Sequence, residues 1–542
     1  MKLQPAADID APPGRNADAP AERTASTARL RIRARTGHGM PADPRPGTPP
    51  ILARLWADQA ANGLRRRAPR LSAHGRHHAW LGILAAAILL SSLAALPLAG
   101  TMLARIPALI CVPVFLALTV LRLAATALPA RWAPRRDLPR SVLPRASLMV
   151  ALYDEADILP DLIAALDRID YPADRLQILL VIEETDRPTR AALDNIRLDR
   201  RYEVVMVPPG APQTKPRALN YALRFCNGTI VGIHDAEDRP HPRQLRTAVE
   251  SFAAAGTELA CLQAPLNWYN HAETWLTHQF AMEYAAHFHA LLPLYRLLGW
   301  PLPLGGTSNY FRTATVRRAG GWDAWNVTED ADLGIRLHAL GYRCDLIAPM
   351  TLEEAPVTLK AWLPQRTRWL KGYLQTLGVH TGLDPHRRKR LIPLALTLGG
   401  SVLSAIAHGP AALICLFTLV TGACPEALQP LYGGLLLLGY LASVCCILRG
   451  MARAGLTPRL IDLVRLPLYW PCQSWAAARA LYQQVAAPYV WEKTRHGVSA
   501  MAGRICPSPS SPPSSCSPSA LRSSSSPAGE PPSPCVRNAD RA

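Results

Sequence analysis

Cysteine pairs at metal-binding or disulfide spacing are missing from this 542-residue chain. Its twelve cysteines are scattered, and none belongs to a Cys-x-x-Cys pair. Cys445 and Cys446 are adjacent within an apolar run, whereas Cys506, Cys516 and Cys535 lie in a low-complexity tail. The spacing therefore predicts neither a zinc site nor a disulfide framework.

Sequence patterns of nucleic-acid-binding proteins are also missing, although the formal net charge is +19. No interleaving of aromatic and basic residues and no finger spacing occurs, so we expect no nucleic-acid partner. The arginines gather instead at the edges of apolar runs and in the N-terminal segment, at Arg29, Arg31, Arg33, Arg35 and residues 65–67. This distribution is typical of membrane-protein segments that face the cytoplasm.

A signal peptide is not predicted, because the first long apolar run begins only near Trp80. Residues 1–76 are rich in Ala, Pro, Arg and Asp without sustained periodicity, and we expect a disordered basic arm. Residues 503–542 are rich in Ser and Pro, and we expect a disordered tail.

Two apolar runs in the N-terminal third have the length of membrane spans. Residues 80–99 carry no charge and match the roughly 20 residues that one span needs. Residues 106–129 form a second run that only Arg122 interrupts. Arginines are more numerous before the first run and after the second than between them. We therefore expect a transmembrane hairpin over residues 77–130 with both ends in the cytoplasm.

Further apolar runs follow near the C-terminus. Residues 391–421 and 429–448 are joined by a connector without Lys or Arg, as expected of a loop outside the cell. Residues 466–491 could form another span, but the run holds Arg479 and leads into the polar sequence WEKTRHG. We favour an interfacial or re-entrant helix there. Residues 390–495 are thus predicted to hold transmembrane and interfacial helices.

Between the two groups of apolar runs the sequence alternates strand and helix patterns. Helices are expected over residues 157–166 and 213–224. Strands are expected at SLMVALY (147–153), LQILLVI (176–182), residues 202–207 and residues 229–233. This alternation predicts an α/β domain with a parallel sheet.

Acidic residues follow three of these strands. The strand over 229–233 leads into Asp235, Glu237 and Asp238, and the two earlier strands also end in carboxylates: Asp154, Glu155, Glu183, Glu184 and Asp186. In open α/β sheets ligands bind beyond the carboxyl ends of the strands. Carboxylates this close repel unless a cation lies among them, and hard oxygen ligands suit Mg²⁺ or Mn²⁺. The pattern favours a metal-nucleotide site; the alternative is a solvated acidic turn.

Four short motifs accompany the acidic residues in a fixed order. They are TKPRALN with Lys215, LGGTSNYFR with Gly306 and Thr307, VTEDADL with Glu329 and Asp330, and QRTRW with Gln365, Arg368 and Trp369. With HDAED, the TED and QRTRW motifs resemble the spaced acidic residues and QxxRW of processive family 2 glycosyltransferases, the cellulose synthase-like membrane group. The resemblance covers residues 145–495, and the ordered set is more specific than any one motif.

The resemblance implies a fold and an activity. It implies a cytoplasmic GT-A catalytic domain over residues 145–385, flanked by transmembrane helices in the inner membrane, and a UDP-sugar donor. The implied metal ligands are Asp235 with Glu237 or Asp238, where Glu237 replaces the family's second aspartate. The implied donor-binding residues are Glu183 or Glu184, which would contact the nucleotide base, together with Lys215, Asp235, Gly306 and Thr307. Asp330 would be the catalytic base, and Gln365, Arg368 and Trp369 would cap the site.

The chemistry of these residues agrees with sugar transfer. A divalent cation with Lys215 and Arg368 can stabilise a diphosphate leaving group, and Asp330 can accept the acceptor's proton. One base without a covalent nucleophile predicts inversion at the anomeric carbon. Simpler roles remain open: Asp330 at a helix N-terminus, Trp369 in an interface belt, or Arg368 beside anionic lipid.

We therefore expect an inverting transferase that extends a β-linked polysaccharide from a UDP-sugar at the lipid bilayer. One alternative is a non-processive transferase that acts on a polyprenyl phosphate or another lipid. A second is a catalytically silent membrane scaffold or transport partner. The sugar, the linkage, the acceptor and any protein partner are not encoded in these motifs.

Overall fold

A computed structural model describes residues 49–75, 102–381, 388–407, 409–410, 429–493 and 497–500. The predicted span at 80–99, the loop around Cys424 and the predicted tail at 503–542 lie outside these residues. The remaining expectations about the fold can be followed in the described part of the chain.

A seven-stranded mixed sheet carries the α/β domain. Its strand order is β3-β2-β1-β4-β8-β6-β9. All neighbours in the sheet pair in parallel except β8, which runs antiparallel to β4 and β6. The strands span β1 Ala146–Leu152, β2 Leu176–Glu183, β3 Tyr202–Val207, β4 Ile230–His234, β6 Leu259–Gln263, β8 Asn309–Arg312 and β9 Arg343–Leu346. The four strands predicted from the sequence are confirmed to within two residues.

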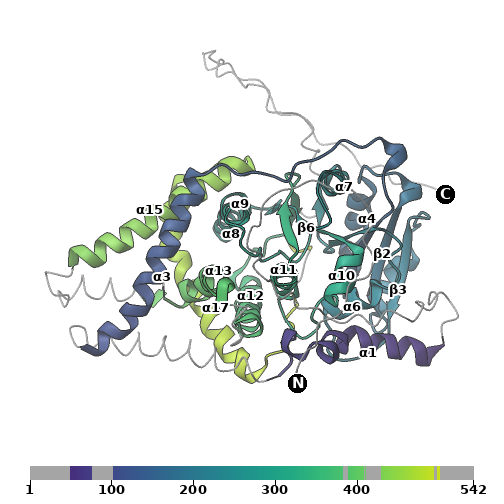
Figure 1. The fold of residues 1–542 in the computed structure, drawn as a ribbon, viewed down its shortest axis with the longest axis horizontal. Coiled ribbons are helices and arrows are strands. Elements are labelled where there is room, and N and C mark those ends of the chain that lie inside the picture. Colours follow the sequence, from purple (N-terminus) through teal and green to yellow (C-terminus); the bar gives the residue numbers. More distant parts are fainter. Residues whose placement is uncertain are drawn as a thin grey trace, which may run out of the picture. The chain divides into compact units, whose positions relative to one another are not determined.

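Helices cover both faces of this sheet (Figure 1). Every residue of β2 is buried, which explains its continuous apolar sequence, because a central parallel strand has no solvent-facing side. One apolar core joins the sheet to α4 (Leu159–Asp167) and α7 (Gln244–Ala254). A second core joins it to α6 (Lys215–Ala222) and α11 (Glu329–Ala339). The shorter helices α5 (Arg187–Asp194) and α10 (Thr313–Ala319) complete the domain.

A small second sheet lies beside the carboxyl end of β4. It has the order β5-β10-β7, formed by Arg239–Pro240, Thr351–Glu353 and Leu266–Trp268. Strand β5 follows the acidic residues after β4 directly, and β10 pairs with it in antiparallel register. The pairing fixes the position of the acidic segment between two sheets.

A layer of helices connects the sheet to the apolar part of the protein. Helix α8 (Trp275–Ala286) continues through a π-helical turn into α9 (Leu292–Leu297) and packs against α15 (Gln429–Ala454). Helix α12 (Leu359–His380) packs against α17 (Leu466–Ala486), and α3 (Met102–Ala127) packs along α15. Figure 1 shows α3 and α15 on the side opposite β2 and β3.

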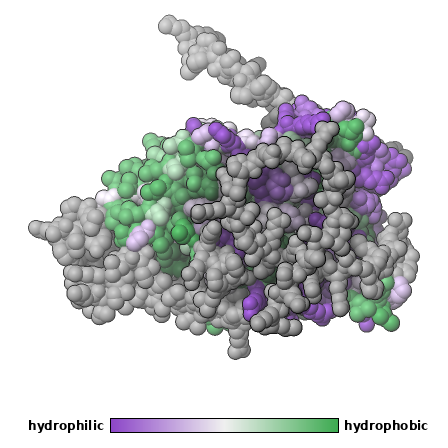
Figure 2. Space-filling view, viewed as in Figure 1, coloured by the Kyte–Doolittle hydropathy of each residue, from purple (hydrophilic) through white to green (hydrophobic). Residues whose placement is uncertain are grey.

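Two helices in the described residues are long and apolar enough to cross a membrane. They are Arg390–Ala407, which begins within α13 (Arg388–Leu394) and contains a π-helical turn, and Gly433–Ala454 within α15. Val112–Ala127 of α3 is a shorter apolar stretch. Figure 2 shows apolar side chains gathered over the α3 and α15 end and hydrophilic ones over the sheet. The number of spans and the cytoplasmic orientation remain predictions.

The expectation of a disordered arm over residues 1–76 is wrong for its last third. Pro50–Arg67 form the helix α1, whose buried side chains include Trp56 and Leu64. Trp56 and neighbouring alanines pack into the apolar core around α6. The Asp323 carboxylate then accepts hydrogen bonds from the Ser72 hydroxyl at 2.9 Å and the Ala73 amide at 2.6 Å. The segment is therefore part of the α/β domain.

The apolar run at 466–491 contains helix α17, preceded by the short α16 (Leu460–Val464). One face of α17 packs on α12 through Tyr469 and small residues around Ala477. Its opposite face exposes Leu468, Trp475 and Tyr482, which recur every seven residues. This two-sided pattern is compatible with the predicted interfacial helix, which stays a prediction.

Candidate active site

The carboxyl ends of β1, β2 and β4 lie side by side. Leu152 of β1 pairs with Ile182 of β2, and Val150 of β1 pairs with His234 of β4. A cavity of about 660 Å³ opens at this edge, and its lining includes Glu155, Glu183 and Asp235. The sequence-based expectation that three strands bring their carboxylates to one edge is confirmed.

Lys215 and Asp235, which both line this cavity, form an ion pair. Lys215 is the first residue of α6, so the helix start directs its side chain toward the end of β4. Its amine also donates to the Gly306 carbonyl at 2.8 Å. Desolvation lowers the pKa of Lys215, but the carboxylates of Asp235 and Glu329 outweigh it and hold the pKa above its usual value. Lys215 is therefore a fixed cation at this edge.

Gly306 marks the point at which the predicted residues converge. A Cβ at this position would lie 3.4 Å from Asp330 Oδ2, 3.9 Å from Asp235 Oδ2 and 4.0 Å from Lys215 Nζ. Glycine thus leaves space between a base candidate, an acid and a cation. The next residues turn sharply into β8, with Ser308 at a φ of +54°, a conformation that non-glycine residues adopt rarely.

Glu329 and Asp330 begin helix α11, as their motif predicted. Both line the cavity; Glu329 is buried, whereas Asp330 is partly exposed to it. Burial raises the pKa of both carboxyls, and the mutual repulsion of the pair adds to the shift at Glu329. The Ala331 amide donates to Asp330 Oδ1 at 2.8 Å, which leaves the other oxygen toward the cavity side of Gly306. This arrangement suits a carboxylate that must accept a proton near neutral pH.

The three acidic residues after β4 do not all face the cavity. Asp235 and Glu237 line it, whereas Asp238 is 1% exposed and lies outside the lining. One Asp238 oxygen accepts from His234 Nδ1 at 3.0 Å, from the Asp235 amide at 3.1 Å and from the Thr307 hydroxyl. Asp238 thereby ties β4 to the Gly306–Thr307 turn, and of the two alternatives for the second metal ligand only Glu237 reaches the cavity.

Within the described residues no group of three or more His, Cys, Asp or Glu side chains forms a ready-made metal site. The residues nevertheless fit a cation held partly by substrate. Buried Glu353 adds a third acidic group close to Asp235 and Glu237, and one of its oxygens has no hydrogen-bond partner. Mg²⁺ is usually held by one or two carboxylates with substrate phosphates and water, so Asp235 and Glu237 can suffice.

The structure also distinguishes between Glu183 and Glu184, the two candidates for contact with the nucleotide base. Glu183 lines the cavity and pairs with Arg217 at 2.6 Å. Burial raises the pKa of Glu183 to about 7, against the opposing effect of Arg217. Glu184 is exposed and outside the lining. The structure thus brings Glu183, and not Glu184, to the site.

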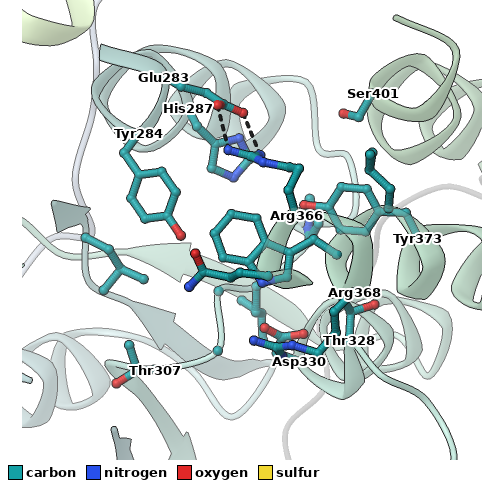
Figure 3. A pocket seen from close by; sticks show the side chains of 18 of the residues that line it. Glu283, Tyr284, His287, Thr307, Thr328, Asp330, Arg366, Arg368, Tyr373 and Ser401 are labelled. Atoms are coloured by element: carbon teal, nitrogen blue, oxygen red, sulfur yellow. Dashed lines mark hydrogen bonds and ion pairs between the residues drawn. The ribbon is translucent and has the colours of Figure 1, made fainter. Parts of the chain in front are cut away.

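The three QRTRW residues approach the cavity from α12. Arg368 lies with its guanidinium carbon 4.3 Å from the centre of the Trp491 ring. Trp369 packs on Tyr284, with ring centroids 5.9 Å apart, so one part of the indole remains for the cavity. Gln365 lines the cavity with a buried side-chain oxygen that has no hydrogen-bond partner. Figure 3 shows Arg368 beside Asp330.

Several lining residues were missed by the sequence motifs. Lys493 pairs with Glu155 at 3.0 Å, and Trp491 precedes it on the same segment. The other pair is Glu283 of α8 with Arg366 of α12, joined by two bonds of 2.8 and 2.7 Å. Glu155 was one of the acidic residues noted after the first predicted strand, but no role was assigned to it. The other four are distant from the motifs or hidden within them, and only the packing of α8, α12 and the C-terminal segment brings them in.

Part of this chain is similar to a known protein family. Residues 230–461 match the family model described as glycosyl transferase family group 2. One relative is the beta-monoglucosyldiacylglycerol synthase of Synechocystis sp., 31% identical over 42% of this chain and 47% of that protein. Another is the probable glucomannan 4-beta-mannosyltransferase 10 of Arabidopsis thaliana, 27% identical over 42% of each chain.

The chain spans about half the length of the curated relatives that it matches. Among solved structures, a mannosyltransferase from Pyrobaculum calidifontis in complex with GDP-mannose and Mn²⁺ matches with a TM-score of 0.45 and 18% identity. That match covers 69% of this chain and 98% of the archaeal one.

Proposed function

We propose that this chain, whose residues 230–461 match the model of glycosyl transferase family group 2, transfers a sugar with inversion from a nucleotide-diphosphate sugar to an acceptor that enters from the bilayer side. The observation that carries the proposal is the convergence of Lys215, Asp235 and Asp330 on Gly306 at the carboxyl edge of the sheet. The fold is proposed to be of the GT-A type, with a UDP-sugar as donor.

The donor's diphosphate would lie between Lys215, Arg368 and Lys493, which all line this part of the cavity. These cations stabilise the negative charge that develops on the leaving diphosphate. Asp235 and Glu237 would hold Mg²⁺ or Mn²⁺, and the ion would supply further charge neutralisation of the phosphates. Glu183, at the end of β2, would lie toward the nucleoside.

Asp330 would accept the proton of the attacking hydroxyl. Its carboxylate lies beside the space that Gly306 leaves open, and its raised pKa makes it a stronger base than an ordinary aspartate. Trp369 offers an aromatic surface on which the acceptor sugar can stack. Because one carboxylate acts as base and no covalent intermediate is needed, the anomeric configuration inverts.

The proposed acceptor is a growing β-linked polysaccharide, and the site would face the cytoplasm in a multi-pass inner-membrane protein. A lipid acceptor is the second candidate, because the cavity continues between apolar helices: Leu118 and Leu121 of α3 and Ile447 of α15 line its inner part. A silent scaffold is disfavoured by the cluster of cations and acids at Gly306. The names of two relatives contain diacylglycerol and glucomannan, which are examples of the lipid and polysaccharide classes.

The proposal can be tested with the purified full chain in lipid nanodiscs. A panel of UDP- and GDP-sugars with Mg²⁺ or Mn²⁺ should give nucleotide release and a glycan or glycolipid product. Asp235→Ala should abolish transfer and weaken binding of the nucleotide only when the metal is present. Glu184→Ala, on an exposed residue after the same strand as Glu183, serves as the matched control. Full activity in EDTA, or no nucleotide release with any donor, would contradict the proposal.

A further inference from the structure

The cavity at Gly306 does not end at the sheet. Beyond Tyr284 and Trp369 it continues into an inner part lined by α3, α15 and the helical segment 395–407. Three serines, Ser401, Ser404 and Ser443, and one cation, Arg122, are the polar side chains that these three helices add to the lining, together with Thr397. Figure 3 shows Ser401 across the cavity from the labelled residues of α8.

Arg122 is the most unusual of these residues. It interrupts an otherwise apolar stretch of α3, and it is partly buried. Among the described residues, no hydrogen bond or ion pair engages its guanidinium, and the titratable groups near it are the Cys446 thiol and the Tyr295 phenol. Both groups are ordinarily neutral at pH 7. The five N–H donors of the guanidinium thus have no anionic partner within the described part of the chain.

Glu283, the acidic residue of this region, already has a cationic partner. Glu283 is the carboxylate that the described helices α3, α8, α12, α15 and α17 contribute to the lining. Arg366 bonds both its oxygens, and the Tyr469 hydroxyl and the Gln473 amide donate to it at 3.0 and 3.3 Å. Glu283 therefore balances Arg366, and the positive charge of Arg122 is left over.

Keeping an unbalanced cation in an apolar helix is unfavourable, and such residues in membrane segments commonly line a ligand pathway. A guanidinium is shaped for two parallel hydrogen bonds to a phosphate or carboxylate. The serine hydroxyls add neutral polar groups: Ser401 and Ser443 donate to the helix carbonyls of Thr397 and Gly439 and keep oxygen lone pairs for a ligand.

We propose that the inner part of the cavity binds a phosphate group of the acceptor, with Arg122 as the binding residue. The proposal rests on the proposed glycosyl transfer at Gly306, and it favours the second acceptor candidate, a lipid, with the addition that this lipid is anionic. The apolar lining around Arg122 favours a phosphate attached to a long hydrocarbon chain. A free phosphate ester would present the same group without the chain.

Binding can be measured separately from catalysis. The full chain in nanodiscs is titrated with a long-chain alkyl phosphate and with the neutral alcohol of the same chain length. The wild-type protein should bind the phosphate at least tenfold more tightly. Arg122→Gln should remove most of this preference, and Arg122→Lys should retain part of it. Arg131→Gln, on an exposed arginine just after α3, is the matched control and should retain all of it.

Two further measurements decide the source and the relation to transfer. If inorganic phosphate displaces the alkyl phosphate at equal concentration, the ligand is a free phosphate; if it does not, the hydrocarbon chain is part of recognition. Equal affinity for phosphate and alcohol, or an unchanged preference in Arg122→Gln while UDP binding shows a folded protein, would overturn the subsite. Absence of sugar transfer with the phosphate preference intact would instead reject the proposed function alone.

Discussion

At the scale of single residues, two adjacent carboxyls at the start of α11 have different surroundings. Glu329 is 3% exposed, and its carboxyl interacts electrostatically with the Lys215 ammonium. Asp330 is the residue with an oxygen beside the open space at Gly306. Only one of two consecutive helix residues can point at an acceptor in this space. The roles of base and of buried neighbour can therefore be separated by substitution.

We expect Asp330→Asn to retain binding of the donor and the metal while transfer falls by about 100-fold or more, because an amide cannot accept the proton. Glu329→Gln, the adjacent control, should have a milder effect. Donor titrations and initial rates on both variants check this. If Asp330→Asn transfers sugar at nearly the wild-type rate while Glu329→Gln is inactive, the catalytic base is Glu329 and not Asp330.

The pH dependence of transfer tests the same carboxyl. Burial raises the pKa of Asp330, so the residue becomes protonated, and inactive as a base, at a higher pH than the usual value of about 3.9. The kcat/KM should therefore rise with pH through a transition that lies above about pH 3.9. As the pH falls below this transition, Asp330 is protonated and kcat/KM should drop. Rates between pH 4 and 9 are the measurement, with donor affinity followed in parallel. A profile that is flat down to pH 4 would contradict this role for Asp330.

At the scale of elements, α12 presents two functions on neighbouring residues. Arg368 faces the proposed diphosphate beside Trp491, while Trp369 packs among the aromatic side chains of α8. We expect Arg368→Ala to lower turnover through lost stabilisation of the leaving group. Trp369→Ala should instead shorten or release the product. Product length and UDP affinity are measured on both variants, and an equal loss of UDP affinity would contradict this division.

Helix α1 carries a second prediction at this scale. Trp56 is 6% exposed and packs near Phe225, with ring centroids 6.3 Å apart. Trp56→Ala should therefore weaken the docking of α1 by about 3 kcal/mol, the lower range for removing a buried tryptophan. Leu55→Ala, whose side chain is 59% exposed on the same helix, should have little effect. Protease cleavage and hydrogen exchange within α1 report the difference. Equal protection in both variants would show that the helix is not held by this contact.

The strands were predictable because their signals are local. Apolar β-branched runs ended by carboxylates mark β1, β2 and β4, and the order of the parallel strands then brings Glu183 and Asp235 to one edge. Helix α1 was not predictable in this way, because its alanines and arginines resemble a solvated arm until Trp56 meets α6. Likewise, nothing near Lys493 in sequence indicates Glu155, since the pair depends on how the C-terminal segment lies on the domain.

At the scale of the whole molecule, the apolar helices and the α/β domain share one continuous cavity. If the catalytic domain faces the cytoplasm, the connector around Cys424 should face outside, because it separates two apolar runs and lacks Lys and Arg. A membrane-impermeant thiol reagent applied to intact cells should label Cys424. A cysteine at exposed Arg200, before β3, should react only after lysis. Labelling of Arg200→Cys in intact cells would show that the catalytic domain faces outside, opposite to the predicted orientation.

The attachment of α1 has a topological consequence. Residues 50–73 lie against the α/β domain through Trp56 and the bonds of Ser72 and Ala73 to Asp323, and the chain re-enters the same domain at β1. Both ends of the intervening stretch are therefore on one side of any bilayer. Whatever path that stretch takes, it must cross the bilayer an even number of times. If each of the two N-terminal apolar runs crosses once, as the sequence predicts, a protein that lost only one of them could not keep α1 docked.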